Sequence, residues 1–181
     1  MAKYDKVTYK LSIEELELIP RRLRAEAKKE IGSYIKEEII SKVQSGSSPV
    51  SGENFKQLSK KYADRMKSGD RNPNLTLFEN LLPAIESKNR SGNDIEIGIY
   101  KASETGKADG HNKHHDTSEE KLSKRRFIPV EGQNFKKDII NGVKSIVNNY
   151  KEEASEQEEL IESIASETGL SRSQIIRSLD L

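Results

Sequence analysis

The polar stretch from residue 101 to residue 123 contains the side chains best suited to chemistry in this chain. All three histidines of the 181-residue protein lie there, in the run HNKHHD at residues 111–116. His111 and His114 are three residues apart and Asp116 adds a carboxylate, so the run could supply ligands to a divalent metal ion. The alternative is a solvated loop. We favour it, because no further ligands follow downstream and a polar loop is not a rigid scaffold.

Other signatures of catalysis are missing from the sequence. The chain has no cysteine, so it has neither a thiolate nucleophile nor a disulfide framework. It also lacks the glycine-rich phosphate loop, the dinucleotide fingerprint, the zinc-protease motif and the serine-hydrolase motif. Adjacent carboxylates such as Glu14 and Glu15 fall on polar helix faces, where charged runs ordinarily face solvent. We therefore expect no enzyme, with no catalytic, cofactor-binding or metal-binding residue and no cofactor.

The composition favours a protein that buries part of its surface against neighbouring chains. Apolar residues make up 33% of the chain and charged residues 34%, and there is no tryptophan, so the core must be small. Residues 151–181 hold three basic and eight acidic residues, a net charge of −5, which leaves +6 on the other 150 residues. Such an asymmetry permits charge-guided docking. Without a run of ~18 apolar residues or a signal peptide, we expect a soluble protein made in a cytoplasm.

Apolar periodicity predicts the helices. Residues 21–44 carry apolar side chains every three to four positions, which predicts a long helix that starts near Pro20 and ends before Gly46. Gly32 inside it either weakens the helix or marks a close contact. Ser12, with Glu15 three residues later, fits a capping box. A second amphipathic helix is predicted from an Asn134 cap to Tyr150.

Alternating apolar residues predict a small sheet. Residues 94–100 are the clearest strand, residues 84–90 are its expected partner across a turn at 91–93, and residues 126–130 are expected to form another strand. Residues 101–123 are expected to be a long loop. The tail, residues 151–181, is predicted to hold a helix at 157–167, a stop at Gly169 and a short helix capped by Ser171.

The fold class that follows is α+β: a long N-terminal helix and a second helix packed on a small antiparallel sheet, with a C-terminal helical hairpin. We expect two parts, an α+β domain at residues 1–150 and an acidic helical extension at residues 151–181. The extension has enough apolar positions for a hairpin but not for its own core, so we expect it to dock either on its own body or on a neighbouring component of a ring.

Two basic clusters, at residues 21–29 and 121–137, could contact the phosphates of a nucleic acid. Intermixed acidic residues cancel much of their charge, and the net charge is low for a nucleic-acid-binding domain. The turn from Thr168 to Ser173 is similar to that of ribbon-helix-helix or helix-turn-helix repressors. However, the preceding stretch KEEASEQEE is acidic and does not resemble a base-reading strand. We favour a hairpin for protein contact.

Five segments, in order, resemble parts of one family over residues 20–150. They are Ser48-Pro49-Val50-Ser51-Gly52 with Phe55, Leu58, Ser59, Tyr62 and Ala63; Pro73-Asn74-Leu75 and Leu77 with Leu81-Leu82; Ile95-Glu96-Ile97-Gly98-Ile99; Ala108 with His111-Asn112; and Arg125-Arg126-Phe127-Ile128-Pro129 with Phe135 and Ile139-Ile140. On these segments the chain resembles the virion-morphogenesis proteins of tailed bacteriophages that form the neck, also called tail-completion proteins. A glycine expected soon after the His-Asn pair is replaced by the stretch Lys113-His114-His115-Asp116. The tail after Tyr150 lies outside the resemblance.

The resemblance implies a structural protein located in the virion, at the neck between head and tail, and assembled in the host cytoplasm. Its expected partners are further copies of itself in a ring, commonly sixfold, together with neighbouring neck, connector and tail-terminator proteins and, by proximity, channel DNA. No membrane is involved. The alternative within the same resemblance is a tail-tube terminator, and a DNA-binding regulator acting through the C-terminal helices is less favoured.

The expected site residues divide into two groups. Assembly-interface candidates are Arg125, Arg126, His111, Asn112 and Arg172. Core anchors are Phe127, Ile128, Ile97 and Ile139. Arg125 and Arg126 would meet acidic groups of an adjacent subunit or face the DNA channel, and the alternative is that they are simply exposed.

Overall fold

The computed structural model describes residues 6–66, 68–72, 80–113 and 125–179. These residues form an α+β fold with a small antiparallel sheet, as predicted, and the sheet has three strands. The elements are β1 (Val7–Ser12), the 3-10 helix η1 (Glu14–Leu18), α1 (Arg21–Gln44), α2 (Lys60–Met66), β2 (Ile85–Asn89), β3 (Asp94–Ile99), α3 (Ala102–Lys113), α4 (Lys137–Thr168) and α5 (Arg172–Ser178).

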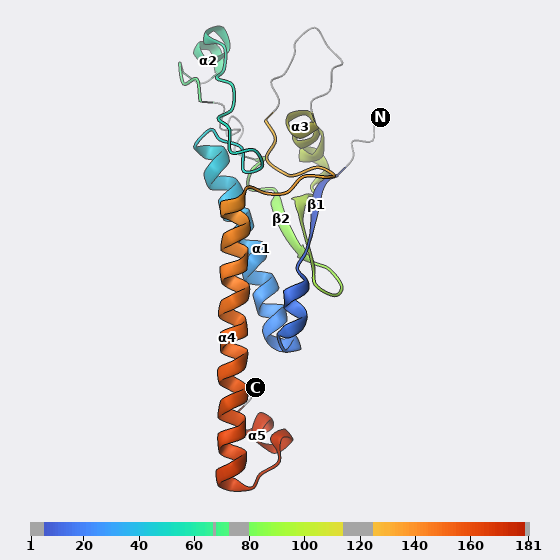
Figure 1. The fold of residues 1–181 in the computed structure, drawn as a ribbon. Coiled ribbons are helices and arrows are strands. Elements are labelled where there is room, and N and C mark those ends of the chain that lie inside the picture. The colour runs from blue at the N-terminus through green and yellow to red at the C-terminus, as the bar shows by residue number, and fades with distance from the viewer. Residues whose placement is uncertain (1–5, 67, 73–79, 114–124, 180–181) are drawn as a thin grey trace.

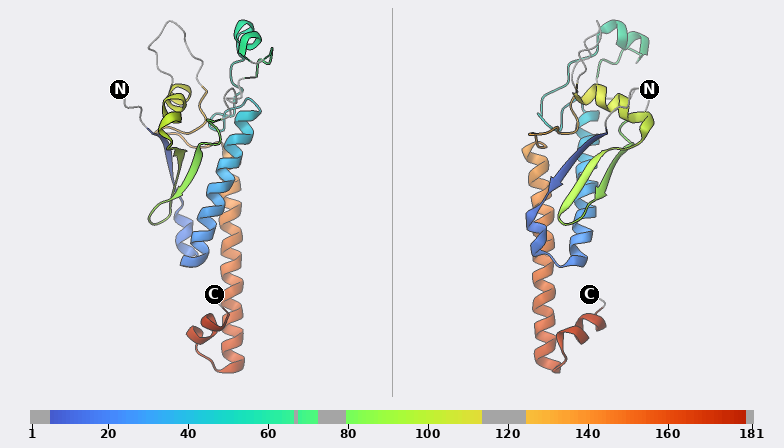
Figure 2. Two further views of the ribbon diagram at one scale, coloured as in Figure 1. Left: turned by 180° about the vertical axis from the view of Figure 1, so that it is seen from behind. Right: turned by 90° about the vertical axis from the view of Figure 1, so that its right-hand side faces the viewer.

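The molecule is elongated along its two long helices. Figure 1 shows α1 and α4 side by side, with the sheet on the other side of α1. The small helix α2 lies at one end of the long axis, and the end of α4 with α5 lies at the opposite end (Figure 2). The C-terminal part of α4 extends past η1 and the start of α1, so it has left the body of the fold.

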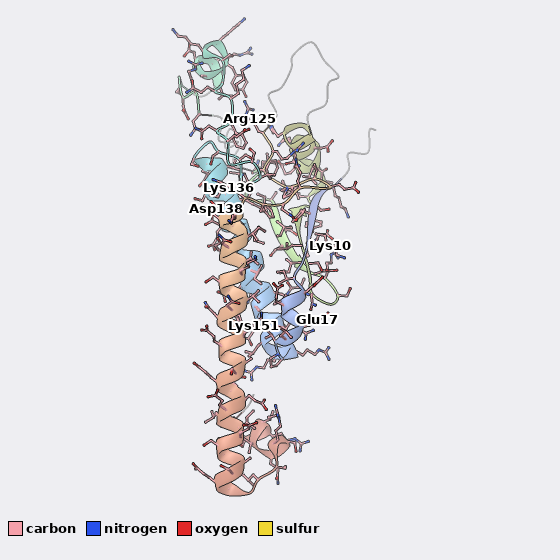
Figure 3. All side chains as sticks on the ribbon, viewed as in Figure 1. Lys10, Glu17, Arg125, Lys136, Asp138 and Lys151 are labelled. Carbon is pink, nitrogen blue, oxygen red and sulfur yellow. The ribbon has the colours of Figure 1, made fainter. Side chains whose placement is uncertain are left out.

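Helix α1 is the central element because its apolar stripe is buried, as predicted, between the sheet and α4. The buried apolar residues of this stripe are Leu23, Ala27, Ile31, Ile35, Ile39 and Val43. Gly32 does mark a close contact, since a Cβ atom there would lie 2.5 Å from the Ser87 hydroxyl oxygen on β2. Asp138 lies at the start of α4 (Figure 3). Its carboxylate lies 2.7 Å from the ammonium group of Lys42 on α1, which ties the two helices together.

The sheet has the strand order β1-β3-β2, and both pairings are antiparallel. The predicted hairpin of residues 84–90 and 94–100 is confirmed as β2 and β3. Strand β1 was not predicted. It pairs Val7 with Ile99 and Ser12 with Asp94, so Ser12 ends a strand. The capping box expected at Ser12 is therefore wrong: η1 follows Ile13 and has no side-chain cap.

The long loop expected at residues 101–123 is also wrong in part, because residues 102–113 form α3. Residues 114–123 lie outside the described part of the chain. The strand expected at residues 126–130 is wrong as well, since these residues are irregular. The physical reason lies in their backbone: the N–H groups of Phe127 and Ile128 donate to the side chain of Asn112, and Pro129 has no N–H to offer.

Helix α4 is continuous from Lys137 to Thr168. The helix end expected at Tyr150 is therefore wrong, and the segment expected to be a separate helix at 157–167 is the C-terminal part of α4. The boundary expected between residues 150 and 151 lies inside it. Asn134 does not cap α4, since its side-chain oxygen instead accepts a hydrogen bond from the Tyr9 hydroxyl. The stop at Gly169, with φ of 69°, and the position of Ser171 as the N-cap of α5 are both as predicted. Gln174 completes a capping box with Ser171, which was not predicted.

All four expected core anchors, Phe127, Ile128, Ile97 and Ile139, are 0% exposed. The core they join includes residues of β1, η1, α1, β3 and α4. Within the described residues, none of the helices is long and apolar enough to cross a membrane.

Candidate functional site

Three segments that are far apart in the sequence meet beside the end of α1. They are the loop after α1, the C-terminal end of α3, and residues 125–128, and we call their meeting point the three-segment junction. It is held by two buried polar side chains, those of Ser48 and Asn112. Each of them binds the backbone of residues 125–128, so the path of that irregular segment is fixed by side chains rather than by a sheet.

Ser48 connects the loop after α1 to the junction. Its hydroxyl donates to the carbonyl oxygen of Arg126 at 2.7 Å. The Ser48 hydroxyl oxygen also accepts hydrogen bonds from the N–H groups of Val50 at 3.2 Å and Ser51 at 3.1 Å. The loop is able to turn there because Gly46 and Gly52 adopt positive φ angles of 83° and 78°.

Asn112 connects α3 to the junction from the opposite side. Its side-chain oxygen accepts hydrogen bonds from the N–H groups of Phe127 at 3.0 Å and Ile128 at 2.9 Å. Its side chain is 0% exposed. We expected Asn112 at an assembly interface, but the side chain has no free surface, so it can shape an interface only by fixing residues 127 and 128.

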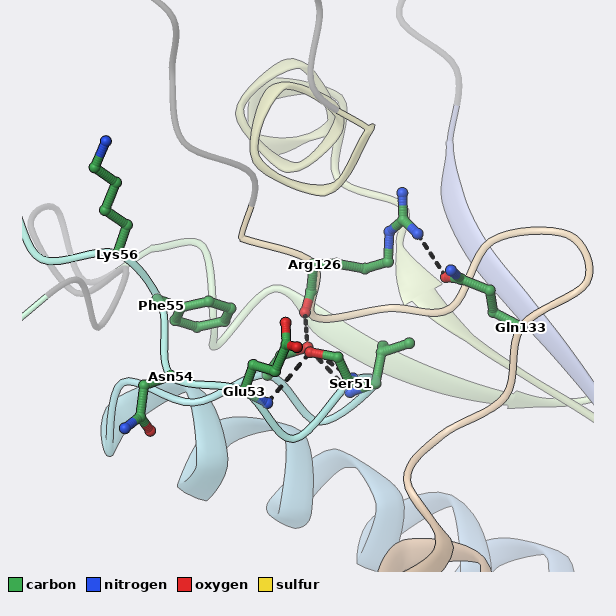
Figure 4. Close-up of a pocket in the computed structure, with 9 residues that line it drawn as sticks. Ser51, Glu53, Asn54, Phe55, Lys56, Arg126 and Gln133 are labelled. Atoms are coloured by element: carbon green, nitrogen blue, oxygen red, sulfur yellow. Dashed lines mark hydrogen bonds between the residues drawn. The ribbon is translucent and has the colours of Figure 1, made fainter.

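Arg126 lies at the surface of the junction and lines a cavity of about 300 Å³. Its Nη1 donates to the Gln133 side-chain oxygen at 2.7 Å, and its Nε donates to the Asn112 carbonyl at 3.3 Å. Figure 4 shows the Arg126 side chain directed toward Gln133, with Phe55 and Glu53 on the other wall. The cavity is thus lined by a cation (Arg126), an anion (Glu53) and an aromatic ring (Phe55). Such a lining suits a protein side chain as occupant.

Arg125 is 8% exposed and does not have the free surface expected of it. Its backbone N–H donates to the His111 carbonyl at 3.0 Å, and its Nε has no hydrogen-bond partner within the described residues. Burial lowers the pKa of its guanidinium. Burying a cation is costly, and at 8% exposure the Arg125 side chain presents little charge at the surface for a neighbouring subunit or for phosphate.

His111 is half-buried next to Arg125. Burial, reinforced by the charge of Arg125, lowers the pKa of His111 from 6.5 to about 4, so its ring is neutral at pH 7. In the part of the chain that the structure describes, no three potential metal ligands come together. His114, His115 and Asp116 lie outside the described residues.

Arg172 lies outside the junction, at the start of α5. Its guanidinium forms an ion pair with Glu158 of α4 and so fastens the turn between the two helices. Ile161 and Ile175 are buried where α4 and α5 pack. Arg172 therefore has a role inside its own chain, and the junction does not bring it together with the other interface candidates.

Sequence reasoning missed Ser48 and Gln133 as partners of Arg126. A signal for Ser48 was present, since a serine two residues before a backbone N–H in a turn commonly accepts a hydrogen bond from it. Gln133 offered no such signal, because only the fold brings it to Arg126.

A comparison of the chain with protein-family models, with curated proteins and with solved structures finds no match. The resemblance to phage neck proteins accordingly rests on the sequence segments named above.

Proposed function

We propose that this chain is a structural component of the head–tail joint of a tailed bacteriophage, a neck or tail-completion protein that assembles as a ring and lets a tail join the DNA-filled head. One observation carries the proposal. Three of the five segments that resemble this family meet at the three-segment junction, through Ser48, Asn112 and residues 125–128.

The chemistry of the junction supports a structural role. The side-chain oxygens of Ser48 and Asn112 are engaged with backbone groups, which leaves them as supports rather than reactive groups. His111 is neutral at pH 7 and Arg125 is buried. The groups at the surface, Arg126 and the cavity it lines, are suited to a neighbouring protein side chain.

The alternative of a DNA-binding regulator receives less support. Arg172, the residue expected to contact DNA, is paired with Glu158. The described part of the C-terminal extension, residues 151–179, has three basic and seven acidic residues, a net charge of −4. A segment of that charge repels phosphate.

The proposal is tested with the phage that encodes the chain. Lysates made without the protein should contain separate filled heads and tails of normal length, visible by negative-stain electron microscopy, and supplying the wild-type chain should restore joined particles. Tails of uncontrolled length in place of normal ones would assign the chain to the tail-terminator role instead. Normal infectious particles in its absence would falsify both roles.

A further inference from the structure

The two ends of the long axis differ in charge and share exposed apolar side chains. The described residues have five large, exposed apolar side chains, and four of them lie at these ends. Leu160, Leu170 and Leu179 are 49%, 42% and 39% exposed at the C-terminal end, and Tyr62 is 41% exposed on α2. Exposed apolar residues rimmed by charge are typical of protein contact sites.

The acidic end consists of residues 151–179, which we call the C-terminal lobe. Ile161 and Ile175 close the contact between α4 and α5, so the lobe has a small packed centre of its own. The three leucines lie outside that centre, and the lobe carries seven glutamates against three basic residues. The lobe therefore combines a few exposed apolar side chains with a net charge of −4.

The basic end consists of residues 54–66 and 68–72, which we call the α2 lobe. It holds five basic and two acidic residues, a net charge of +3. The basic residues are Lys56, Lys60, Lys61, Arg65 and Arg71. All five are exposed, as is Tyr62. This end therefore has a net charge opposite to that of the C-terminal lobe and one large exposed aromatic ring.

The two lobes of one chain are not placed to meet. Figures 1 and 2 show α2 and α5 at opposite ends of the molecule in every view. Among the elements of the described chain, the substantial packing of α5 is with α4 alone. Near the start of the extension, Ala154 packs against the core of the body. Helix α5 packs on α4 instead, so the hairpin end of the extension does not dock on its own body.

We propose that the C-terminal lobe of one copy docks on the α2 lobe of a second copy, with the leucines against Tyr62 and the glutamates against the lysines. The two contacting surfaces differ, and each copy carries both of them. The same contact can therefore repeat from one copy to the next. Such a head-to-tail contact closes into a ring when its rotation permits. The inference deepens the proposed function, since it names the contact by which the ring would form.

The test uses two charge-reversed variants of the full chain, Lys60→Glu with Lys61→Glu, and Glu159→Lys with Glu162→Lys. Analytical ultracentrifugation at 150 mM NaCl measures self-association of each. We expect each double variant to raise the concentration needed for association roughly tenfold or more, which corresponds to about 1.4 kcal/mol. An equimolar mixture should associate again. In an alternating assembly one contact is that of the wild type, and the other places the two introduced glutamates against the two introduced lysines.

Two matched controls separate this contact from general effects. Glu14→Lys with Glu15→Lys makes the same charge change on η1, away from both lobes, and should leave association unchanged. Leu160→Ser should weaken association, whereas Leu18→Ser should not, although Leu18 is the most exposed of the five apolar residues at 72%. Circular dichroism confirms that each variant is folded.

The outcomes are decisive for the contact independently of phage assembly. A wild-type chain that remains monomeric, or reversals that leave association unchanged, or a mixture that fails to recover, would each overturn the docking proposal. The lysate experiment would still decide whether the chain acts at the neck. Conversely, restored association in the mixture supports the contact even if the chain proves to have another function.

Discussion

The side chain of Asn112 holds the backbone of Phe127 in place: its oxygen accepts the Phe127 N–H at 3.0 Å, inside a region with no exposed surface at either residue. The same oxygen accepts the N–H of Ile128. One side chain on α3 thus replaces a neighbouring strand as the acceptor for two consecutive backbone donors. This contact makes α3 and residues 125–128 a single unit.

Replacing Asn112 by alanine should destabilise the fold by roughly 2–4 kcal/mol, because two buried N–H groups lose their acceptor and each unsatisfied group costs about 1–3 kcal/mol. Urea unfolding followed by circular dichroism measures the change. Asn149→Ala, at an exposed position of α4, is the control and should change the free energy of unfolding by less than about 0.5 kcal/mol. Equal stability of the two variants would show that the Asn112 hydrogen bonds contribute little.

Phe127→Ala should cost about 3–5 kcal/mol, since the ring is 0% exposed and its removal leaves a cavity in the core. Phe127→Leu retains most of the buried volume and should cost distinctly less, below about 1.5 kcal/mol if the site repacks. Thermal and urea unfolding of the two variants compare them directly. A small loss for Phe127→Ala would mean that the ring is not a core anchor.

The stability of the fold should fall between pH 7.5 and pH 5 because of His111. Its pKa is lowered from 6.5 to about 4 in the folded chain, so the unfolded chain binds the proton more readily in this range. The unfolded state then gains stability as pH falls, and the expected loss is roughly 2 kcal/mol at pH 5. The stabilisation is fully present above pH 6.5 and is lost as pH falls toward 4.

His111→Gln provides the comparison for this pH dependence. The variant has no titrating group at this position. Between pH 7.5 and pH 5 its free energy of unfolding should therefore fall by roughly 2 kcal/mol less than that of the wild type. Urea titrations at several pH values measure both proteins. The assignment to His111 is wrong if the variant and the wild type lose stability in parallel.

Gly142→Ala should destabilise the chain, although alanine favours helices by about 1 kcal/mol over glycine. A Cβ atom at residue 142 of α4 would lie 2.0 Å from the Tyr34 hydroxyl oxygen on α1, so the two helices would have to separate or Tyr34 would have to move. Gly110→Ala in α3 meets no atom within 4 Å and should be stabilising by roughly 0.4–1 kcal/mol. Melting temperatures that shift in opposite directions confirm the contrast, and a stabilising Gly142→Ala contradicts it.

The amino-acid sequence by itself determined the elements whose signal is local and strong. The buried stripe of α1 repeats over its whole length, and the alternation of Ile95, Ile97 and Ile99 determines the buried face of β3. Gly169 and Ser171 specify the turn between α4 and α5, since a left-handed C-cap and a capping box depend only on neighbouring residues. These features were predicted correctly because periodicity and caps act within a few residues.

Tertiary structure alone decided the elements with weak or ambiguous local signals. Residues 102–113 contain Gly106 and Gly110 and little apolar surface, which favours a loop, yet burial of Ala108 and Asn112 stabilises them as α3. Residues 126–130 have the composition of a strand, but their backbone donors are bound by Asn112, a residue whose proximity no local pattern reveals. The burial of Arg125 and the separation of the acidic and basic lobes have the same origin. A backbone group or a charge is satisfied by whatever the fold brings beside it, and that depends on residues far away in the sequence.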